Sequence, residues 1–308
     1  MNFFITFLIF MIILFLYVHI NDQYKKGEDL EIYELDYVSN SHLQDICNVK
    51  QPTVFEMRNI TPEIFYTIEN REPFANCENI DIKVKDVLDY WNPKVVSVDP
   101  IILSTSSFHT LMKSDPKAHF LMEDNPELFL DTETKIGYLD AVRELDDFLK
   151  PSFTMHTKYD MLMGSDKCVT PLRYHTEYRK FLIVAKGKIS VKMTPWKSRK
   201  HLHPVVDYDN YEFFSKINPW SIQKEYLNEM DKLKFLDFEV LAGHVLYIPP
   251  FWWYSIQLHE DTQVLSIQYQ TTMNIISNLP DIFRYYLQFH NTKLKVSRTY
   301  NIPIESAI

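Results

Sequence analysis

The spacing of hydrophobic and polar positions changes along this chain, and each spacing predicts a different kind of structure. Residues 2–20 are apolar almost without interruption, and residues 21–45 are polar and acidic. Between about 151 and 270, short segments rich in Val, Ile, Phe, Tyr and Thr alternate with Pro, Gly, Asp and Asn. That alternation is typical of an antiparallel β sandwich or barrel. The chain therefore predicts an apolar leading segment followed by a mainly β body.

The apolar segment at residues 2–20 contains no charged side chain unless His19 is protonated. About twenty apolar residues cross the hydrocarbon core of a bilayer as a helix. A cleaved signal peptide is the alternative, but no basic region precedes the segment and no small-residue cleavage site ends it. We therefore expect residues 1–20 to be a single-pass membrane anchor. Lys25 and Lys26 follow it, which places the body in the cytosol by the positive-inside tendency.

The rest of the chain divides into three parts. Residues 21–45 are expected to form an acidic tether with little packing. Residues 46–290 are expected to form one domain that includes a C-terminal helix, and residues 291–308 a tail. From residues 50–57 onward strands and short helices are expected to alternate, and residues 81–91 and 138–149 are expected to be helical at least in part.

Two hairpins and a terminal helix complete the predicted elements. Residues 181–195 are expected to turn near Lys186-Gly187, and residues 238–249 near Ala242-Gly243. Residues 278–290 carry apolar side chains at helical spacing, with Asn278 as the expected cap and proline in the first turn.

Charge and cysteine content narrow the function classes. The 308-residue chain has a net charge of −9, which argues against nucleic acid as a partner. Its cysteines, Cys47, Cys77 and Cys168, form no CxxC pair, which argues against a disulfide framework and against structural zinc. Reduced thiols in a cytosol-facing body are the simpler interpretation.

One strand carries candidate metal chemistry. A facial metal triad in a β barrel needs two ligands at positions i and i+2, since alternate side chains point into the barrel. Arg173, His175 and Glu177 would share one face of a strand. On a later strand Trp252 and Tyr254 would share one face, and Trp253 would lie on the other.

Four stretches carry a resemblance to a known family: KQPTVF, TPLRYH, AKGKISVKMTP and GHVLYIPPFWWYSI. Over about residues 50–290 the chain resembles the cupin-like, JmjC-related branch of the 2-oxoglutarate-dependent Fe(II) oxygenases. The resemblance implies a mainly β fold with flanking helices (α+β), built as a cupin or double-stranded β-helix (jelly-roll) barrel. The Trp-Trp-Tyr-Ser-Ile ending is also similar to cupin-like proteins of large DNA viruses. Because terminal helices in this family often pack into dimers, the resemblance also implies a homodimer formed through residues Leu279 to Leu287.

The iron-ligand positions of that family are changed in this chain. The family pattern Thr-Pro-x-His-x-Asp supplies two ligands, and here Arg173 and His175 stand in those places. The third ligand follows Trp-Trp, where this chain has Tyr254. A guanidinium has no lone pair for a metal, and tyrosinate is a ligand of ferric iron. Arg173 would instead place a permanent charge where the iron lies, and it would pair with nearby acceptors or bind an anion.

An alternative frame keeps a metal site. Sliding the motif by two residues gives His175 and Glu177 as ligands, with Tyr254 or His259 as the third. For 2-oxoglutarate the resemblance implies contacts from Thr170 and from Lys188 or Lys192. Trp252 and Trp253 would wall the pocket.

These observations support one preferred function and two alternatives. The preferred one is a membrane-anchored cupin-like protein with a degenerate iron site and no cofactor, acting as a non-catalytic binding or scaffold module. The first alternative is an Fe(II)/2-oxoglutarate-dependent protein hydroxylase or demethylase-like oxygenase that uses His175 and Glu177. The second is a cupin that binds a sugar or a small acid without redox chemistry. The barrel hosts many functions, so the fold alone does not choose among them.

Overall fold

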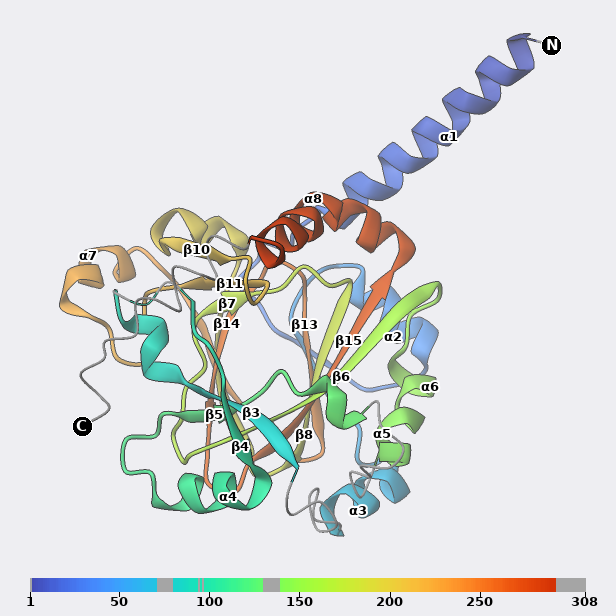
Figure 1. Ribbon diagram of the computed structural model, residues 1–308. Coiled ribbons are helices and arrows are strands. Elements are labelled where there is room, and N and C mark those ends of the chain that lie inside the picture. Colours follow the sequence, from blue (N-terminus) through green and yellow to red (C-terminus); the bar gives the residue numbers. More distant parts are fainter. Residues whose placement is uncertain (1, 71–79, 94, 96, 130–138, 292–308) are drawn as a thin grey trace.

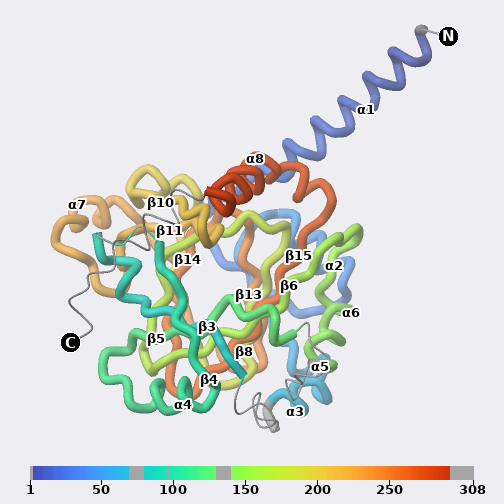
Figure 2. Tube along the Cα trace, in the orientation of Figure 1, coloured from blue at the N-terminus to red at the C-terminus, as the bar shows by residue number. Residues whose placement is uncertain are grey.

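The computed structural model describes residues 2–70, 80–93, 95, 97–129 and 139–291. Figure 1 shows a β-rich body with helices around it and one long helix, α1 (Asn2–Gln23), that projects away from the body. The trace in Figure 2 shows that helix α8 (Thr272–Phe289) lies over the end of the body from which α1 leaves. The expected tail lies outside the described residues from 292 onward, as does Cys77.

Two sheets form the body. In spatial order, the nine-stranded sheet contains β1 (Tyr33–Leu35), β2 (Thr53–Glu56), β13 (His244–Ile248), β8 (Arg179–Lys186), β15 (Gln263–Thr271), β6 (Thr154–Gly164), β5 (Phe120–Met122), β3 (Asp81–Asp86) and β4 (Ile101–Ser104). The six-stranded sheet contains β10 (Pro204–Asp207), β11 (Glu212–Ser215), β7 (Arg173–Tyr174), β14 (Trp253–Leu258), β9 (Lys188–Thr194) and β12 (Leu236–Leu241). The predicted mainly β architecture with flanking helices is confirmed.

Strands of the second half of the chain alternate between the two sheets. β8, β13 and β15 lie in the nine-stranded sheet, whereas β9, β12 and β14 lie in the six-stranded sheet. Each connection from β8 to β9, β12 to β13, β13 to β14 and β14 to β15 therefore crosses from one sheet to the other. This is the winding of a jelly roll, in which two sheets enclose one interior.

The two predicted hairpins are wrong for this reason. Turns do occur after Lys186 and Leu241, but the strands on either side of each turn do not pair with each other. β9 pairs with β14 and β12, and β13 pairs with β2 and β8. Alternation along a strand identifies its buried face, but it does not identify the neighbouring strand.

The two faces of the nine-stranded sheet pack against different partners. On β8, Leu182 and Val184 point into the space between the sheets and pack in the barrel interior. Phe181 and Ile183 point outward and pack under the helices, together with Leu43. The barrel is therefore closed by apolar side chains along most of its length, and a polar layer is confined to one end.

The helices described here are short except for the first and the last. The covering helices are α2 (Asn40–Cys47), α3 (Pro62–Asn70), α4 (Thr105–Ser114), α5 (Leu139–Glu144), α6 (Asp146–Leu149) and α7 (Leu227–Met230). Single 3₁₀ turns occupy Val87–Trp91, Pro126–Phe129, Trp196–His201 and Lys224–Tyr226. The helices expected around residues 138–149 are confirmed as α5 and α6 within the described residues.

The segment expected to be a loosely packed tether is folded onto the body. β1 extends the nine-stranded sheet by pairing in parallel with β2, and α2 buries Leu43 completely. A Cβ on Gly27 would lie 2.0 Å from the carbonyl oxygen of Lys50, so this position packs directly against the backbone. Lys197 donates to the carbonyl of Glu28 at 2.8 Å. The acidic composition concealed the apolar side chains that fix this segment to the sheet.

Two other boundaries differ from expectation. Residues 81–91 begin with strand β3, and only Val87–Trp91 is helical, because Ile82 and Val84 alternate into the core. α8 begins at Thr272, and the side chain of Thr271 caps it by accepting a hydrogen bond from the Asn274 amide. The expected cap, Asn278, lies inside the helix.

Helix α1 is long and apolar enough to cross a membrane, and the apolar side chains of its spanning segment are exposed. An N-terminal signal sequence meets the same criteria of length and composition. The described cysteines, Cys47 and Cys168, are buried free thiols, and burial raises the pKa of Cys47 to about 12. Neither thiol is suited to ligate a metal in this state.

A substitution at Gly187 tests the tight turn by which the chain crosses from β8 to β9 in the other sheet. Its φ is +73°, and a Cβ there would lie 2.6 Å from Oγ1 and 2.9 Å from Cα of Thr262. Gly187→Ala should therefore lower the free energy of unfolding by about 1–3 kcal/mol, measured by urea denaturation in detergent. Lys186→Ala, at the exposed neighbouring position, should change it by no more than about 1 kcal/mol. Equal effects of the two substitutions would contradict the tight turn.

Candidate functional site

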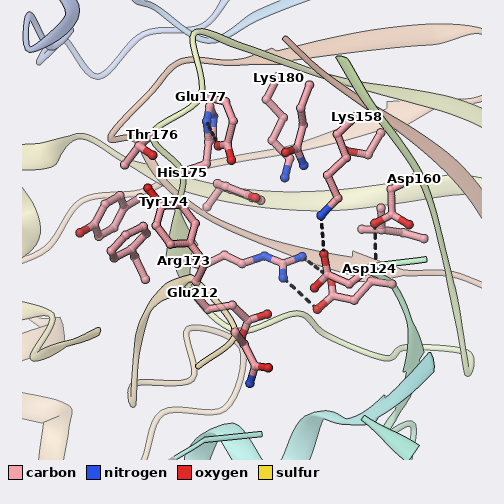
Figure 3. Close-up of a pocket in the computed structure, with 18 residues that line it drawn as sticks. Asp124, Lys158, Asp160, Arg173, Tyr174, His175, Thr176, Glu177, Lys180 and Glu212 are labelled. Carbon is pink, nitrogen blue, oxygen red and sulfur yellow. Dashed lines mark hydrogen bonds and ion pairs between the residues drawn. The ribbon is translucent and has the colours of Figure 1, made fainter. Parts of the chain in front are cut away.

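A polar cavity of about 140 Å³ lies between the sheets at one end of the barrel. β7 and β14 bring two predicted residues together there, since Arg173 and Tyr254 are direct cross-strand partners. Figure 3 shows that the cavity is lined by charged side chains from both sheets and from the segment after β5. The charged and imidazole side chains of the lining are Glu123, Asp124, Lys158, Asp160, Arg173, His175, Glu177, Lys180 and Glu212.

Arg173 is fixed by a two-pronged ion pair. Its Nη1 and Nη2 donate to the two carboxylate oxygens of Glu123 at 2.9 and 2.6 Å. Burial lowers the pKa of Arg173, but Glu123 outweighs this and the pKa lies well above its ordinary value. The guanidinium carbon lies 5.8 Å from the centre of the Tyr254 ring. Arg173 is therefore a permanent cation at the mouth of the barrel, with one nearly buried carboxylate as its partner.

A second internal cation lies beside this pair. The ammonium of Lys85 contacts carboxylate oxygens of Glu212 at 2.5 Å, Asp124 at 2.9 Å and Glu123 at 3.3 Å. Burial lowers the pKa of Lys85, but Glu212 and the other carboxylates raise it well above its ordinary value. The Tyr90 hydroxyl donates to the other oxygen of Glu212 at 2.8 Å. Lys85 therefore stays charged in the centre of three carboxylates.

These three carboxylates are the only described His, Cys, Asp or Glu side chains whose ligand atoms gather closely enough to hold a metal ion, with all of them within 4.8 Å of one another. Their oxygens face the Lys85 ammonium, which supplies the positive charge that a metal ion would supply. We call this set of Lys85, Glu123, Asp124, Arg173 and Glu212 the internal charge network.

Lys158 and Asp160 on β6 extend the internal charge network along the cavity wall. Lys158 donates to Asp124 at 2.8 Å, and Asp160 accepts the backbone amides of Asp124 and Asn125. Burial, and then the charge of Asp124, raise the pKa of Asp160 to about 6. Asp160 thereby orders the backbone turn that presents Glu123 and Asp124 to their cations.

His175 and Glu177 face each other at the rim. Nε2 of His175 lies 3.0 Å from the carbonyl oxygen of Ile248, so this nitrogen carries the proton and donates it. Nδ1 of His175 lies 3.2 Å from Oε2 of Glu177. Burial lowers the pKa of His175, which favours the neutral ring. Beyond this contact with each other, Nδ1 and Oε2 have no hydrogen-bond partner, so the pair offers two adjacent atoms that could ligate a metal.

Residues 92–275 match a known family, the cupin-like domain, and this match spans more than half of the chain. The chain belongs to the cupin-like domain family. No curated protein matches the chain. The cupin-like barrel is the part that holds the cavity, since β7, β8, β14 and β15 all lie within the matched residues.

The residues at the three positions that correspond to oxygenase iron ligands do not fit an iron(II) triad. Arg173 has no lone pair to offer and is committed to Glu123. His175 donates from Nε2 to a backbone carbonyl, and Tyr254 packs in the barrel cluster as a buried phenol. Ferrous facial triads use neutral imidazole and carboxylate donors, and this cupin-like site presents one imidazole there.

His175, Glu177 and His259, the alternative set of metal ligands, do not meet at one point either. His259 follows β14 five residues beyond Tyr254, at the opposite end of the strand, and its Nε2 contacts Ser190 Oγ at 2.8 Å. His175 and Glu177 do lie together, but among the described residues they have no third His, Cys, Asp or Glu donor atom within 4.8 Å of both. The slid frame therefore brings two of its ligands together and leaves Tyr254, whose ring centre lies 6.2 Å from that of His175, as the remaining candidate for the third.

The residues expected to contact 2-oxoglutarate lie outside the cavity lining. Thr170 is buried and its Oγ1 accepts the Ile256 amide. Lys188 and Lys192 point away from the barrel and pair with Glu239 and Asp237. β9 buries Ile189, Val191 and Met193 in the interior, so its lysines are on the opposite face.

The two tryptophans pack beside the cavity and do not line it. Trp252 belongs to the barrel cluster and donates from Nε1 to the carbonyl of Lys50 at 3.2 Å. Trp253 packs outside the barrel with Tyr174 and Trp196. They fix β14, and hence the position of Tyr254.

Sequence reasoning missed most of the charged residues of the internal charge network and of the cavity lining. The missed residues are Lys85, Glu123, Asp124, Lys158, Asp160, Lys180 and Glu212. A signal was present on two strands: Lys180 alternates in phase with the interior residues Leu182 and Val184, and Asp160 with Leu162. Charged side chains in phase with a buried face mark positions that need partners. Glu123 and Asp124 follow a three-residue strand, where no period can be recognised.

Arg173→Met should lower the free energy of unfolding by about 3–5 kcal/mol, because it leaves Glu123 as a buried charge without its main partner. Urea denaturation of the full chain in detergent would measure this, with an unchanged m-value. Adding Glu123→Gln should recover part of the loss, and exposed Arg199→Met should change stability by no more than about 0.5 kcal/mol. A loss below about 1 kcal/mol in Arg173→Met would contradict the role of this pair.

Proposed function

We propose that this chain is a membrane-anchored cupin-like binding protein whose barrel takes a small anionic ligand without a resident iron ion. Arg173 in the cavity wall and Lys85 beside it are both neutralised by carboxylates of the internal charge network. The observation that carries the proposal is a further cation, Lys180, which lines the same cavity and forms no ion pair with a carboxylate among the described residues. The internal charge network explains why iron is unnecessary, and Lys180 explains what the cavity recognises.

Lys180 is a nearly buried lysine, 9% exposed, whose ammonium lies 5.5 Å from the centre of the Tyr254 ring. Within the described part of the chain, no carboxylate oxygen lies within 4.0 Å of this ammonium. Buried ammonium groups are costly unless they are paired, so an uncommitted one in a cavity favours an anionic partner. The other internal cations of the cavity already have carboxylate partners.

Two polar side chains extend this anion site. Gln268 on β15 is the direct cross-strand partner of Lys180, and Ser266 lies on the same face of β15 two residues away. The hydroxyl of Ser266 is buried without a hydrogen-bond partner. An ammonium, an amide and a hydroxyl on adjacent strands match the oxygens of a small carboxylate or phosphate. The cavity volume of about 140 Å³ suits a small molecule of this kind.

The anchor is the second part of the proposal. α1 has the length and composition of a membrane span, its apolar side chains are exposed, and it lacks the cleavage features of a signal peptide. Lys25 and Lys26 directly after it place the barrel on the cytosolic side. The anion site would then sample cytosolic ligands at the membrane.

A specific observation favours one competing function, an Fe(II)/2-oxoglutarate oxygenase. Nδ1 of His175 and Oε2 of Glu177 lie 3.2 Å apart and have no hydrogen-bond partner besides each other, which suits two ligands of one metal ion. Against it stand the missing third donor and the nearby positive charge of Lys180, which acts on both residues. We therefore rank this function second.

Lys180→Met tests the anion site. Thermal unfolding of the full chain in detergent, at neutral pH and constant ionic strength, should show stabilisation by one of malonate, succinate or inorganic phosphate over matched chloride. The stabilisation should disappear in Lys180→Met, because the variant keeps the stem but loses the charge. It should persist in Lys186→Met, a control at the other end of the same strand whose side chain is 44% exposed and pairs with Asp261. Equal stabilisation in both variants, or none in the wild type, would contradict the proposed site.

A further inference from the structure

Helix α8 is amphipathic in the reverse of the usual sense. Its polar side chains face the body: Asn274 and Asn278 both donate to the carbonyl of Thr176, at 2.9 and 3.1 Å. Asp281 accepts the hydroxyl of Tyr208 at 2.8 Å. A surface helix of a soluble domain ordinarily buries its apolar stripe and exposes its polar face. Here hydrogen bonds hold the helix in place and the apolar stripe is left outward.

The outward face is a continuous apolar stripe. Leu279, Phe283 and Leu287 follow one another at four-residue intervals, and Tyr286 lies between them on the same side. Their exposed fractions are 51% for Leu279, 63% for Phe283, 58% for Leu287 and 56% for Tyr286. Contiguous exposed apolar side chains of this size mark a surface that contacts another apolar body.

The stripe continues beyond the start of the helix. Thr154 pairs with Thr271, the residue that caps α8, and the side chains on either side of Thr154 are Phe153 and Met155. Phe153 is 89% exposed and Met155 is 68% exposed. Phe153 also has a φ of +61°, a conformation that a bulky side chain seldom adopts. Two further apolar side chains are thus held outward beside the first turn of α8.

The base of α1 is fixed to this same helix. The hydroxyl of Tyr24, directly after α1, donates to the carbonyl of Ser277 in α8 at 2.5 Å. Lys26 packs its ammonium over the rings of Trp196 and Phe251, 4.1 and 4.8 Å from their centres. Figure 1 shows α8 across the end of the body from which α1 projects. A bilayer crossed by α1 would therefore begin beside α8.

We propose that the outward stripe of α8, with Phe153 and Met155, is a membrane-contact surface that lays the barrel against the bilayer crossed by α1. This inference rests on the membrane anchor in the proposed function. Apolar side chains gain free energy when they leave water for the interfacial region of a bilayer, and amphipathic helices bind membranes in this way. α1 holds the stripe within reach of lipid, so the contact needs no separate recruitment.

A second copy of the chain is the competing occupant of the stripe. The tie between Tyr24 and Ser277 favours lipid, because it sets the apolar stripe immediately beside the helix that enters the bilayer. A paired copy would have to dock on α8 while leaving room for α1 at the same end. The test must therefore distinguish lipid, water and protein around the stripe.

Spin labels on the full chain in phosphatidylcholine and phosphatidylglycerol vesicles make this distinction. The parent protein would carry Cys77→Ser, since Cys47 and Cys168 are buried. Nitroxides would be attached one at a time at Phe283→Cys in the stripe, Leu14→Cys in α1 and Lys113→Cys in α4. Collision with molecular oxygen reports lipid, and collision with a water-soluble nickel chelate reports solvent.

The labels at Phe283→Cys and Leu14→Cys should favour oxygen severalfold over the nickel chelate, and the Lys113→Cys label should favour the chelate. A Phe283→Cys label that favours the chelate, with an oxygen-favouring Leu14→Cys label, would overturn the contact surface and leave the anchor intact. A chelate-favouring Leu14→Cys label would overturn the anchor itself. A Phe283→Cys label shielded from both reagents, with spin–spin broadening that disappears on dilution with unlabelled protein, would assign the stripe to a second copy and overturn the inference.

Discussion

The ion pair between Arg173 and Glu123 is the contact on which the candidate site depends. It joins the six-stranded sheet to the segment after β5, and it fixes a guanidinium at the position expected, from the resemblance, to correspond to an iron ligand. Glu123 also contacts Lys85, so the pair is continuous with a second cation and two further carboxylates. Removing Arg173 would leave the buried Glu123 without its main partner and dependent on Lys85, which is why the network acts as a unit. A barrel mouth built this way has its positive charge in the chain itself.

The cost of burying an unpaired charge separates two roles among the cations of the internal charge network and the cavity lining. Lys85, Lys158 and Arg173 have carboxylate partners, and they hold the mouth of the barrel together. Lys180 has none among the described residues, and it lies beside Gln268 on the neighbouring strand. The paired cations stabilise the fold, and the cation without a carboxylate partner is the one proposed to bind an anion. In α8 the polar side chains dock the helix on the body, so its apolar side chains are left exposed for the proposed bilayer contact.

Much of the fold followed from the pattern of residues, and most of the site did not. Alternating segments predicted the mainly β body, and the Thr-Pro and Trp-Trp motifs brought Arg173 and Tyr254 to one place, where they are cross-strand partners. Strand pairing was missed because a turn such as Gly187 looks the same whether the chain folds back or crosses to the other sheet. Glu123 and Lys85 were missed because their meeting depends on short strands far apart in sequence. The packing of α8 was hidden because its polar face is the buried one.

The most direct test of the internal charge network as the replacement for iron is a measurement of bound metal and turnover. The full chain would be prepared anaerobically in detergent with added Fe(II), and its iron content and its formation of succinate from 2-oxoglutarate would be measured. The network predicts iron far below one ion per chain and no succinate above background. Near-stoichiometric iron with succinate formation, both lost in His175→Ala, would contradict it and assign the metal to His175 and Glu177.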